Sequence, residues 1–254
     1  MSAKLEATVA VVTGASSGIG RATAVRLAEE GAAVALVARR RERVEELARA
    51  IEAKGGRALA VEADLTDAEA ANGVVEQVVD RFGRLDILVN AAGVMLNGDT
   101  LRARTEEWDQ MVDVNLKGLM YVTQAALPHL LEAAKSADRQ VADVVNISSV
   151  AGRQAHPTVA IYNATKFGVT AATESWRQEF TRRNVRFSVI GPGAVDTELF
   201  GHQQPHVQES DEQLFAGIEK LHPEDIADAV AYVTTSPRRR AINEIVIRPT
   251  DQAF

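Results

Sequence analysis

The stretch that decides the fold is Val9-Ala10-Val11-Val12-Thr13-Gly14-Ala15-Ser16-Ser17-Gly18-Ile19-Gly20. A β-branched apolar run leads into a glycine-rich turn, and helical periodicity follows it. Such glycines let the backbone approach a pyrophosphate, and the helix N-terminus offers unpaired N–H groups. Ser16 and Ser17 add hydroxyl donors for the same anion. The spacing is Gly-x-x-x-Gly-x-Gly, and a glycine triplet alone also marks ordinary tight turns. Its place after the first strand predicts a dinucleotide-binding turn.

The rest of the chain repeats this alternation of strand and helix. Apolar runs predict strands over residues 8–13, 33–38, 58–62, 87–90, 143–147, 186–190 and 244–247. Because these runs are almost continuously hydrophobic, we expect strands that are covered on both faces. Helical periodicity lies between them, for example over residues 22–30, 44–53 and 72–82. The pattern predicts an α/β fold: a single Rossmann-type, doubly wound domain over residues 1–254, with a seven-stranded parallel sheet and helices on both faces.

Two segments depart from the alternation. Residues 135–140 are polar and predict a surface loop before the fifth strand. Residues 198–220, between the sixth strand and a helix expected from Pro223, contain Gly201, Pro205 and Gly217. Loops of this length in compact domains are usually lids or binding segments, and ligands of open α/β sheets bind beyond the carboxyl ends of the strands. We therefore expect a substrate-binding lid over residues 198–222; the alternative is an inert surface excursion.

Composition excludes several classes of function. The 254 residues include 28 Lys and Arg against 35 Asp and Glu, a net charge of −7, which disfavours a nucleic-acid partner. The absence of cysteine excludes disulfides, cysteine-ligated metals and a thiol nucleophile. Residues 1–6 lack the apolar stretch of a signal peptide, and no apolar run approaches the ~18 residues of a membrane span. We expect a soluble, cytoplasmic protein with no membrane partner.

The end of the second strand predicts which dinucleotide binds. Ala38 is followed by Arg39, Arg40 and Arg41, and the first carboxylate comes at Glu42. Dinucleotide folds that prefer NAD place an acid here to bind the ribose hydroxyls, whereas an arginine accommodates a 2′-phosphate through a charge-assisted contact. The sequence favours NADP(H) over NAD(H), with Arg39 as the main contact. At least one of Arg40 and Arg41 is expected to be a solvated helix start.

A second set of residues predicts proton-transfer chemistry. Ser149 ends the fifth strand, and Tyr162 and Lys166 lie in a helix expected over residues 161–183. Four positions apart, Tyr162 and Lys166 project from one helix face. A phenol with a pKa of about 10 transfers protons poorly at neutral pH unless a nearby cation lowers that pKa, and we expect Lys166 to do so. Ser149 is placed to donate to a substrate oxygen. Alone, Tyr-x-x-x-Lys is common in amphipathic helices; the nucleotide turn is what gives it weight.

Together these motifs resemble the short-chain dehydrogenase/reductase family from Leu5 to the C-terminus. Order and spacing agree, including the thirteen positions from Ser149 to Tyr162. The matching segments are Thr13-Gly14-x-x-x-Gly18-Ile19-Gly20, Asp64-Leu65, Asn90-Ala91-Ala92-Gly93, Asn115, Ser149, Tyr162-x-x-x-Lys166 and Pro192-Gly193-x-x-x-Thr197. Residues 126–131 and 244–252 further resemble the branch that holds clavulanic acid (clavaldehyde) dehydrogenase.

The resemblance implies catalytic roles. Tyr162 is the general acid in reduction, and Lys166 lowers its pKa while holding the nicotinamide ribose. Ser149 positions and polarises the carbonyl, and Asn115 holds a water in a proton relay to Lys166. The implied activity is an NADP(H)-dependent carbonyl reductase, or in reverse an alcohol dehydrogenase, acting on a small molecule without a metal.

The resemblance also implies the cofactor contacts, and the sequence departs from the family pattern at two positions. Asp64 and Leu65 flank the adenine, Asn90 lines the cofactor cleft, and Val195 and Thr197 meet the carboxamide side. Ala91 stands where a second Asn is usual. Ser17 stands where some NADP-preferring members have a basic residue, which leaves the 2′-phosphate more dependent on Arg39 and Arg40.

Assembly and other functions stay open at this point. The family forms dimers or tetramers partly through the helix that carries Tyr162, and small residues there (Ala160, Ala164, Gly168, Ala171, Ala172) permit close packing. The alternatives are a nucleotide-sensing module, which has no need of the set of Asn115, Ser149, Tyr162 and Lys166, and a structural subunit of a larger complex, active or not.

Several residues have no motif to assign them. His202 and His206 suggest a metal site, but Pro205 and the lack of further ligands argue against it. His156 either lines the mouth of the pocket or is simply exposed. Met95, Leu96 and Asn97 line the pocket, or belong to the core or the rim. Trp108 and Trp176 are expected to be packing residues.

Overall fold

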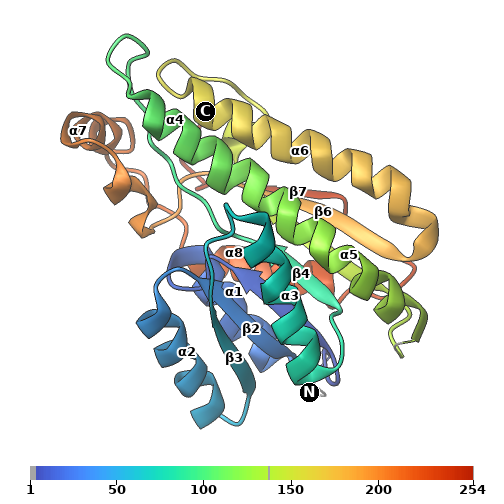
Figure 1. Cartoon of the computed structure of the whole chain (residues 1–254). Helices are drawn as coiled ribbons and strands as arrows, with labels where there is room; N and C mark the ends of the chain where they lie inside the picture. Colours follow the sequence, from blue (N-terminus) through green and yellow to red (C-terminus); the bar gives the residue numbers. More distant parts are fainter. Residues whose placement is uncertain (1–3, 137, 254) are drawn as a thin grey trace.

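A parallel sheet, ordered β3-β2-β1-β4-β5-β6-β7, forms the centre of the protein (Figure 1). This computed structural model describes residues 4–136 and 138–253. The strands are β1 (Val9–Thr13), β2 (Ala33–Ala38), β3 (Arg57–Glu62), β4 (Ile87–Asn90), β5 (Ala142–Ile147), β6 (Val185–Pro192) and β7 (Glu244–Ile247). Each lies within two residues of its predicted ends. The expected fold, a Rossmann-type α/β domain with seven parallel strands, is confirmed.

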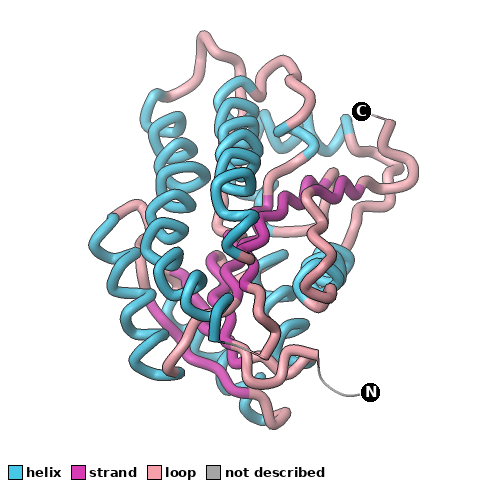
Figure 2. Tube along the Cα trace, turned by 90° about the vertical axis from the view of Figure 1, so that its right-hand side faces the viewer, coloured by secondary structure: helices cyan, strands magenta, loops and turns pink. Residues whose placement is uncertain are grey.

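Helices cover both faces of the sheet (Figures 1 and 2). On one face lie α1 (Gly18–Glu29), α2 (Arg41–Ala53) and α8 (Pro223–Thr234). On the other lie α3 (Ala68–Phe82), α5 (Gly118–Ser136) and α6 (Ala160–Phe180). α4 (Thr105–Val112) passes into α5 through a π-helical turn, η1 (Asp113–Lys117). No helix in the described ranges is long and apolar enough to cross a membrane.

Two apolar cores separate the sheet from its helical layers. Neighbouring side chains of a strand point to opposite faces, so Val12 packs toward α1 and α8 while Val11 packs toward α3 and α5. Trp176 contacts Phe187 in the second core, with ring centroids 5.8 Å apart. A third, smaller cluster under the site contains Trp108. The expected packing roles of both tryptophans are confirmed.

Two segments differ from their predicted structure. The loop expected over residues 135–140 is shorter, because α5 continues to Ser136, whose hydroxyl donates to the Glu132 carbonyl oxygen at 2.9 Å. Ala137 and residues 1–3, on which parts of two sequence predictions fall, lie outside the described residues. Residues 198–220 are not one long loop: they include the short 3₁₀ helix η4 (Glu198–His202) and α7 (Pro205–Leu214). Two further 3₁₀ turns are η2 (Val150–Gly152) and η3 (Thr181–Arg183); η3 ends the helix expected to reach residue 183.

The strand order creates the binding crevice. β1 lies between β2 and β4, and the connections leaving β1 and β4 pass to opposite faces of the sheet. A crevice opens where connections diverge in this way, beyond the carboxyl ends of the strands. All the motifs singled out from the sequence end strands at this edge or lie in the segments that follow them.

Candidate active site

A cleft of about 720 Å³ opens at the carboxyl ends of the strands. Every residue that the sequence predicts to bind the dinucleotide lines it. These are Gly14, Ser16, Ser17, Gly18, Ile19, Gly20, Arg39, Arg40, Asp64, Leu65, Asn90, Ala91, Gly93, Tyr162, Lys166, Pro192, Gly193, Val195 and Thr197. Ser149 lines it as well. The structure therefore brings residues from the whole length of the chain into one continuous cleft.

The glycine-rich turn fits a dinucleotide phosphate. Gly14 has φ +68°, and a Cβ there would lie 2.8 Å from the backbone of Ala91 and Ala92, so the turns after β1 and β4 touch. A Cβ on Gly20 would lie 2.4 Å from the Gly14 carbonyl oxygen, so α1 starts directly against the turn. Ser17 precedes α1 without capping it by its side chain. The first turn of α1, from Gly18 to Gly20, lines the cleft, where its N–H groups can meet an anion.

The three arginines have different surroundings. Arg40 Nη2 donates to Ser16 Oγ at 2.8 Å and to Ser17 Oγ at 2.7 Å. Arg39 also lines the cleft and is exposed. Burial works to raise the pKa of Asp64, but hydrogen bonds from Thr66 and the charge of Arg39 lower it on balance. Arg41 is the solvated helix start: it is exposed and its Nε donates to Glu45 on α2 at 2.7 Å.

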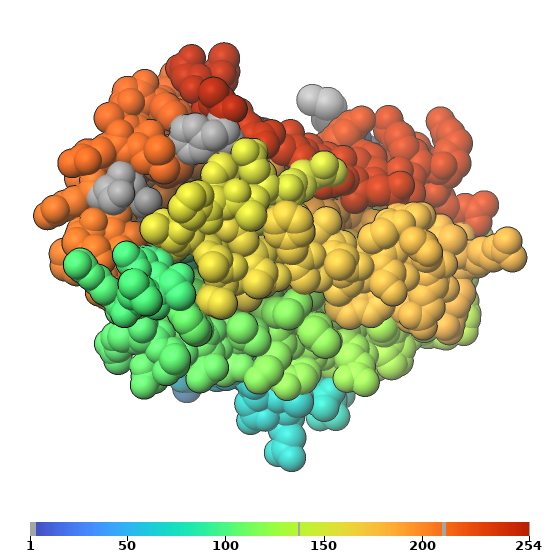
Figure 3. Space-filling view, turned by 90° about the horizontal axis from the view of Figure 1, so that it is seen from above, coloured from blue at the N-terminus to red at the C-terminus, as the bar shows by residue number. Residues whose placement is uncertain are grey.

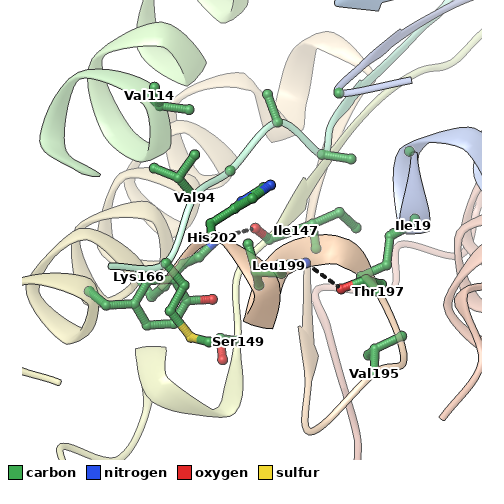
Figure 4. A pocket seen from close by; sticks show the side chains of 18 of the residues that line it. Ile19, Val94, Val114, Ile147, Ser149, Lys166, Val195, Thr197, Leu199 and His202 are labelled. Carbon is green, nitrogen blue, oxygen red and sulfur yellow. Dashed lines mark hydrogen bonds between the residues drawn. The ribbon is translucent and has the colours of Figure 1, made fainter. Parts of the chain in front are cut away.

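Tyr162 and Lys166 lie four positions apart on α6 and both line the cleft, into which Figure 4 shows Lys166 pointing. Both are buried, at 6% and 5% exposure, and the Lys166 ammonium lies 5.6 Å from the centre of the Tyr162 ring. Lys166 Nζ donates to the Ile147 carbonyl oxygen at 3.0 Å. Ser149 caps η2, its hydroxyl accepting from the Ala151 N–H at 3.1 Å. The end of β5 and one face of α6 therefore hold a hydroxyl, a phenol and an ammonium together.

Burial dominates the protonation of this group. It raises the pKa of Tyr162 to about 12, with a hydrogen-bonding contact to Ser149 acting in the opposite direction. Burial also lowers the pKa of Lys166 to about 8. The lowering of the phenol pKa by Lys166 stays a prediction: in this structure the ammonium donates to the Ile147 carbonyl oxygen, and burial is the main cause of the raised pKa of Tyr162. Tyr162 is consequently protonated at neutral pH.

Asn115 lies behind the wall of the cleft rather than on its surface. It belongs to the π-helical turn η1 and is 1% exposed. Its Oδ1 accepts from the Val94 N–H at 2.8 Å, and its Nδ2 donates to the Val94 carbonyl oxygen at 2.8 Å and to Thr165 Oγ1 at 3.3 Å. These bonds use both amide hydrogens and hold the segment after β4 in place. The proton relay expected of Asn115 stays a prediction.

The far end of the cleft is formed by the segment after β6 and by the loop before α6. Figure 3 shows residues 198–222 beside the first residues of α6, and Figure 4 shows Leu199 and His202 over the same pocket as Ser149 and Lys166. Residues lining this end are Met95, Asn97, His156, Leu199, Phe200, His202, Leu214 and Phe215. Of the unassigned residues, Leu96 packs against the third cluster instead. The described residues contain no group of three or more metal-ligating side chains.

One contributor has no signal in the sequence. Gln252, close to the C-terminus, lines the cleft, and its Oε1 accepts from the Ala194 N–H at 2.9 Å. A Cβ on Gly193 would lie 2.2 Å from the same oxygen, so this turn requires glycine. No motif spacing links residues so far apart, and only the fold reveals the contact.

Comparisons with known proteins agree with this geometry. A sequence profile of the family described as short chain dehydrogenase matches residues 8–208. An uncharacterized oxidoreductase of Staphylococcus epidermidis is 39% identical over 247 residues, which cover 97% of this chain and 99% of that protein.

Solved structures extend the likeness to the whole fold. A metagenomic short-chain oxidoreductase in complex with NADP is 34% identical with a TM-score of 0.81, covering 98% of this chain and all of that one. A 3-ketoacyl-(acyl-carrier-protein) reductase from Brucella melitensis complexed with NADH is 31% identical with a TM-score of 0.83, covering 96% of this chain and 98% of that one.

Proposed function

Because this chain belongs to the short-chain dehydrogenase family, we propose that it is an NADP(H)-dependent oxidoreductase that reduces an aldehyde or ketone or oxidises the corresponding alcohol. The observation that carries the proposal is the convergence of Ser149, Tyr162 and Lys166 in the cleft that the glycine-rich turn also lines. A panel of aldehydes, ketones and secondary alcohols with NADPH or NADP⁺, followed by the absorbance of the reduced nicotinamide, tests it. A nucleotide-sensing or structural protein would turn over none of them.

Each part of the dinucleotide has residues suited to it. The turn at Gly14–Gly20 takes the pyrophosphate, and Asp64 and Leu65 take the adenine end. Arg39 and Arg40 take a 2′-phosphate. Lys166 takes the nicotinamide ribose, and the segment from Pro192 to Thr197 takes the carboxamide. Bound in this way, NADPH supplies the hydride for the carbonyl carbon.

Tyr162 is the proposed proton donor in the reduction. Its phenol, with a pKa raised to about 12, keeps its proton at neutral pH. An alkoxide is a base comparable to hydroxide, since the pKa of water is about 15.7, so the phenol can still protonate it. Ser149 holds the oxygen beside the phenol, and Lys166 adds a positive charge close to the ring. Asn115 is proposed to hold a water in a proton relay to Lys166, and its side chain also fixes Val94.

The substrate end of the cleft supports an uncharged carbonyl compound with an apolar body. Met95, Leu199, Phe200, Leu214 and Phe215 supply apolar walls. The charged residues that line the described cleft gather elsewhere, at Arg39, Arg40, Asp64 and Glu198 on the cofactor side and at Lys166. We propose that residues 198–222 act as the lid that shapes this end.

Two further expectations remain parts of the proposal. A dimer or tetramer built partly through α6 is supported by Phe167, which is 43% exposed on that helix. Membership of the clavulanic acid dehydrogenase branch stays a prediction from residues 126–131 and 244–252.

Arg39→Asp tests the cofactor preference. We expect the ratio of kcat/KM for NADPH to that for NADH to fall by about 100-fold, because a hydrogen bond to a charged group contributes about 1.5–3 kcal/mol and about 1.4 kcal/mol corresponds to tenfold. Arg41→Asp is the matched control: it makes the same charge change at an exposed position beside the cleft. Equal ratios for the two variants would refute the role of Arg39.

A further inference from the structure

Glu198 forms ion pairs with two arginines beside the proposed phosphate site. Its Oε2 accepts from Arg40 Nη1 at 2.7 Å, and its Oε1 accepts from Arg43 Nη1 at 2.6 Å. The bonds from Arg40 and Arg43 lower the pKa of Glu198 to about 2. Its carboxylate is therefore an anion throughout the pH range in which the protein is handled.

The same guanidinium belongs to the proposed phosphate site. Arg40 donates to the hydroxyls of Ser16 and Ser17 and to Glu198 at once. A 2′-phosphate held by Arg40 would bring a second anion next to the carboxylate. Since like charges repel and the guanidinium has a limited number of donors, the phosphate and Glu198 cannot both be held as well as either alone.

We infer that Glu198 is a specificity-determining residue whose carboxylate competes with the 2′-phosphate of NADP(H) for Arg40. The inference rests on the proposed function. NAD(H) has a hydroxyl at this place and leaves the pair of Arg40 and Glu198 intact, so the competition weakens only the phosphorylated dinucleotide. Arg43 keeps its bond to Glu198 when Arg40 is taken.

The competition of Glu198 with the 2′-phosphate for Arg40 takes place at the first residue of the proposed lid. Glu198 is the first residue of η4, and the following Leu199 and His202 reach over the pocket (Figure 4). The Thr197 hydroxyl accepts from the Leu199 N–H at 3.3 Å, and a Cβ on Gly18 would lie 3.0 Å from Thr197 Cγ2. The phosphate-binding turn and the start of the lid are thus in contact, so this pair lies between the cofactor and the substrate ends.

Glu198→Gln tests the inference by binding rather than by activity. Glutamine keeps the size and an acceptor oxygen but removes the charge. By calorimetric titration we expect the Kd for NADP⁺ to fall about tenfold, because only part of the free energy of a charge-assisted interaction is recovered. The Kd for NAD⁺ should stay within about twofold. The Kd for adenosine 2′,5′-bisphosphate should fall like that for NADP⁺, and the Kd for 5′-AMP should stay constant like that for NAD⁺.

Glu45→Gln is the matched control. It removes the same charge from the neighbouring helix α2, where Glu45 pairs with Arg41 and does not line the cleft. Both dissociation constants should stay within about twofold in this variant, because the effect comes from the contact with Arg40 and not from the net charge.

The decisive quantity is the ratio of the Kd for NAD⁺ to the Kd for NADP⁺. A rise in Glu198→Gln supports the inference. An unchanged ratio overturns it, and a fall overturns it by showing that Glu198 orients Arg40 for the phosphate. The wild-type ratio tests the proposed function separately: if wild type prefers NAD⁺ while the variant's ratio still rises, the cofactor proposal fails and the inference stands.

Discussion

Tyr162→Phe is expected to lower kcat by roughly 1,000-fold, because general acid catalysis by a positioned side chain contributes about 10²–10⁴-fold. The substitution deletes one oxygen from a ring that is 6% exposed and that packs in the third cluster with Val94 and Met111. Folding should therefore be unaffected. The Kd for NADPH should stay within about tenfold, since the phenol is one of many groups that line the cleft.

Tyr121→Phe provides the control for this prediction. Tyr121 lies on α5, is partly buried against the second core and does not line the cleft. The same deletion of an oxygen should leave turnover and cofactor binding at their wild-type values. Steady-state rates and calorimetric titration with NADPH measure both quantities. Turnover in Tyr162→Phe above about a tenth of wild type would remove Tyr162 from the role of acid.

Lys166→Met is the second prediction, and it separates activity from stability. Methionine fills nearly the same space without the charge. We expect kcat/KM to fall by at least about 100-fold, because a preorganised charge beside the site of proton transfer is lost. At pH 7, however, the variant should be at least as stable as wild type, because burial makes the ammonium unfavourable in the folded state.

The pH dependence of unfolding tests this explanation. Burial lowers the pKa of Lys166 to about 8 in the folded protein from 10.5 for a solvated lysine, so the folded state binds the proton more weakly than the unfolded state. Below pH 8 the buried charge therefore lowers the free energy of unfolding by about 3 kcal/mol, and this destabilisation disappears as the pH rises toward 10.5. Between pH 8 and pH 10.5 the free energy of unfolding of wild type should therefore rise relative to that of Lys166→Met.

An exposed lysine controls for the loss of a positive charge. Lys117 pairs with Asp113 at 2.8 Å and is about half exposed. Lys117→Met should keep full activity, and its difference in stability from wild type should not grow between pH 8 and pH 10. A Lys166→Met protein that keeps wild-type turnover would exclude the cation from the chemistry. A variant whose stability follows wild type in parallel over this pH range would exclude the burial explanation.

The central part of the fold follows directly from the sequence. Strands such as β1 and β2 are continuously apolar because helices cover both of their faces, so their ends lie within one residue of the predicted ones. The spacing of four residues between Tyr162 and Lys166 places both on one helix face, as expected. These features can be predicted from neighbouring residues in the sequence because they depend only on the strand or helix that contains them.

What the sequence did not predict depends on contacts between distant residues. The bond of Arg40 to Glu198 spans 158 positions, and that of Gln252 to Ala194 spans 58. The sequence predicts a loop where α7 forms because the segment contains Gly201, Pro205 and Gly217 and a mixture of polar and apolar residues without a clear helical period. The protonation of Tyr162 depends on burial by surrounding segments, and the bond between Asn115 and Val94 joins two different segments, so spacing in the sequence reveals neither.

Transfer of deuterium from NADPH labelled at C4 of the nicotinamide tests the central claim most directly. Each carbonyl compound that is turned over should carry one deuterium on the former carbonyl carbon when labelled cofactor of the correct face is used, as read by mass spectrometry. The oxygen-bound hydrogen should come from solvent through Tyr162. Consumption of a carbonyl compound without label in the product, or NADPH binding with no turnover of any carbonyl compound, would contradict direct reduction in this cleft.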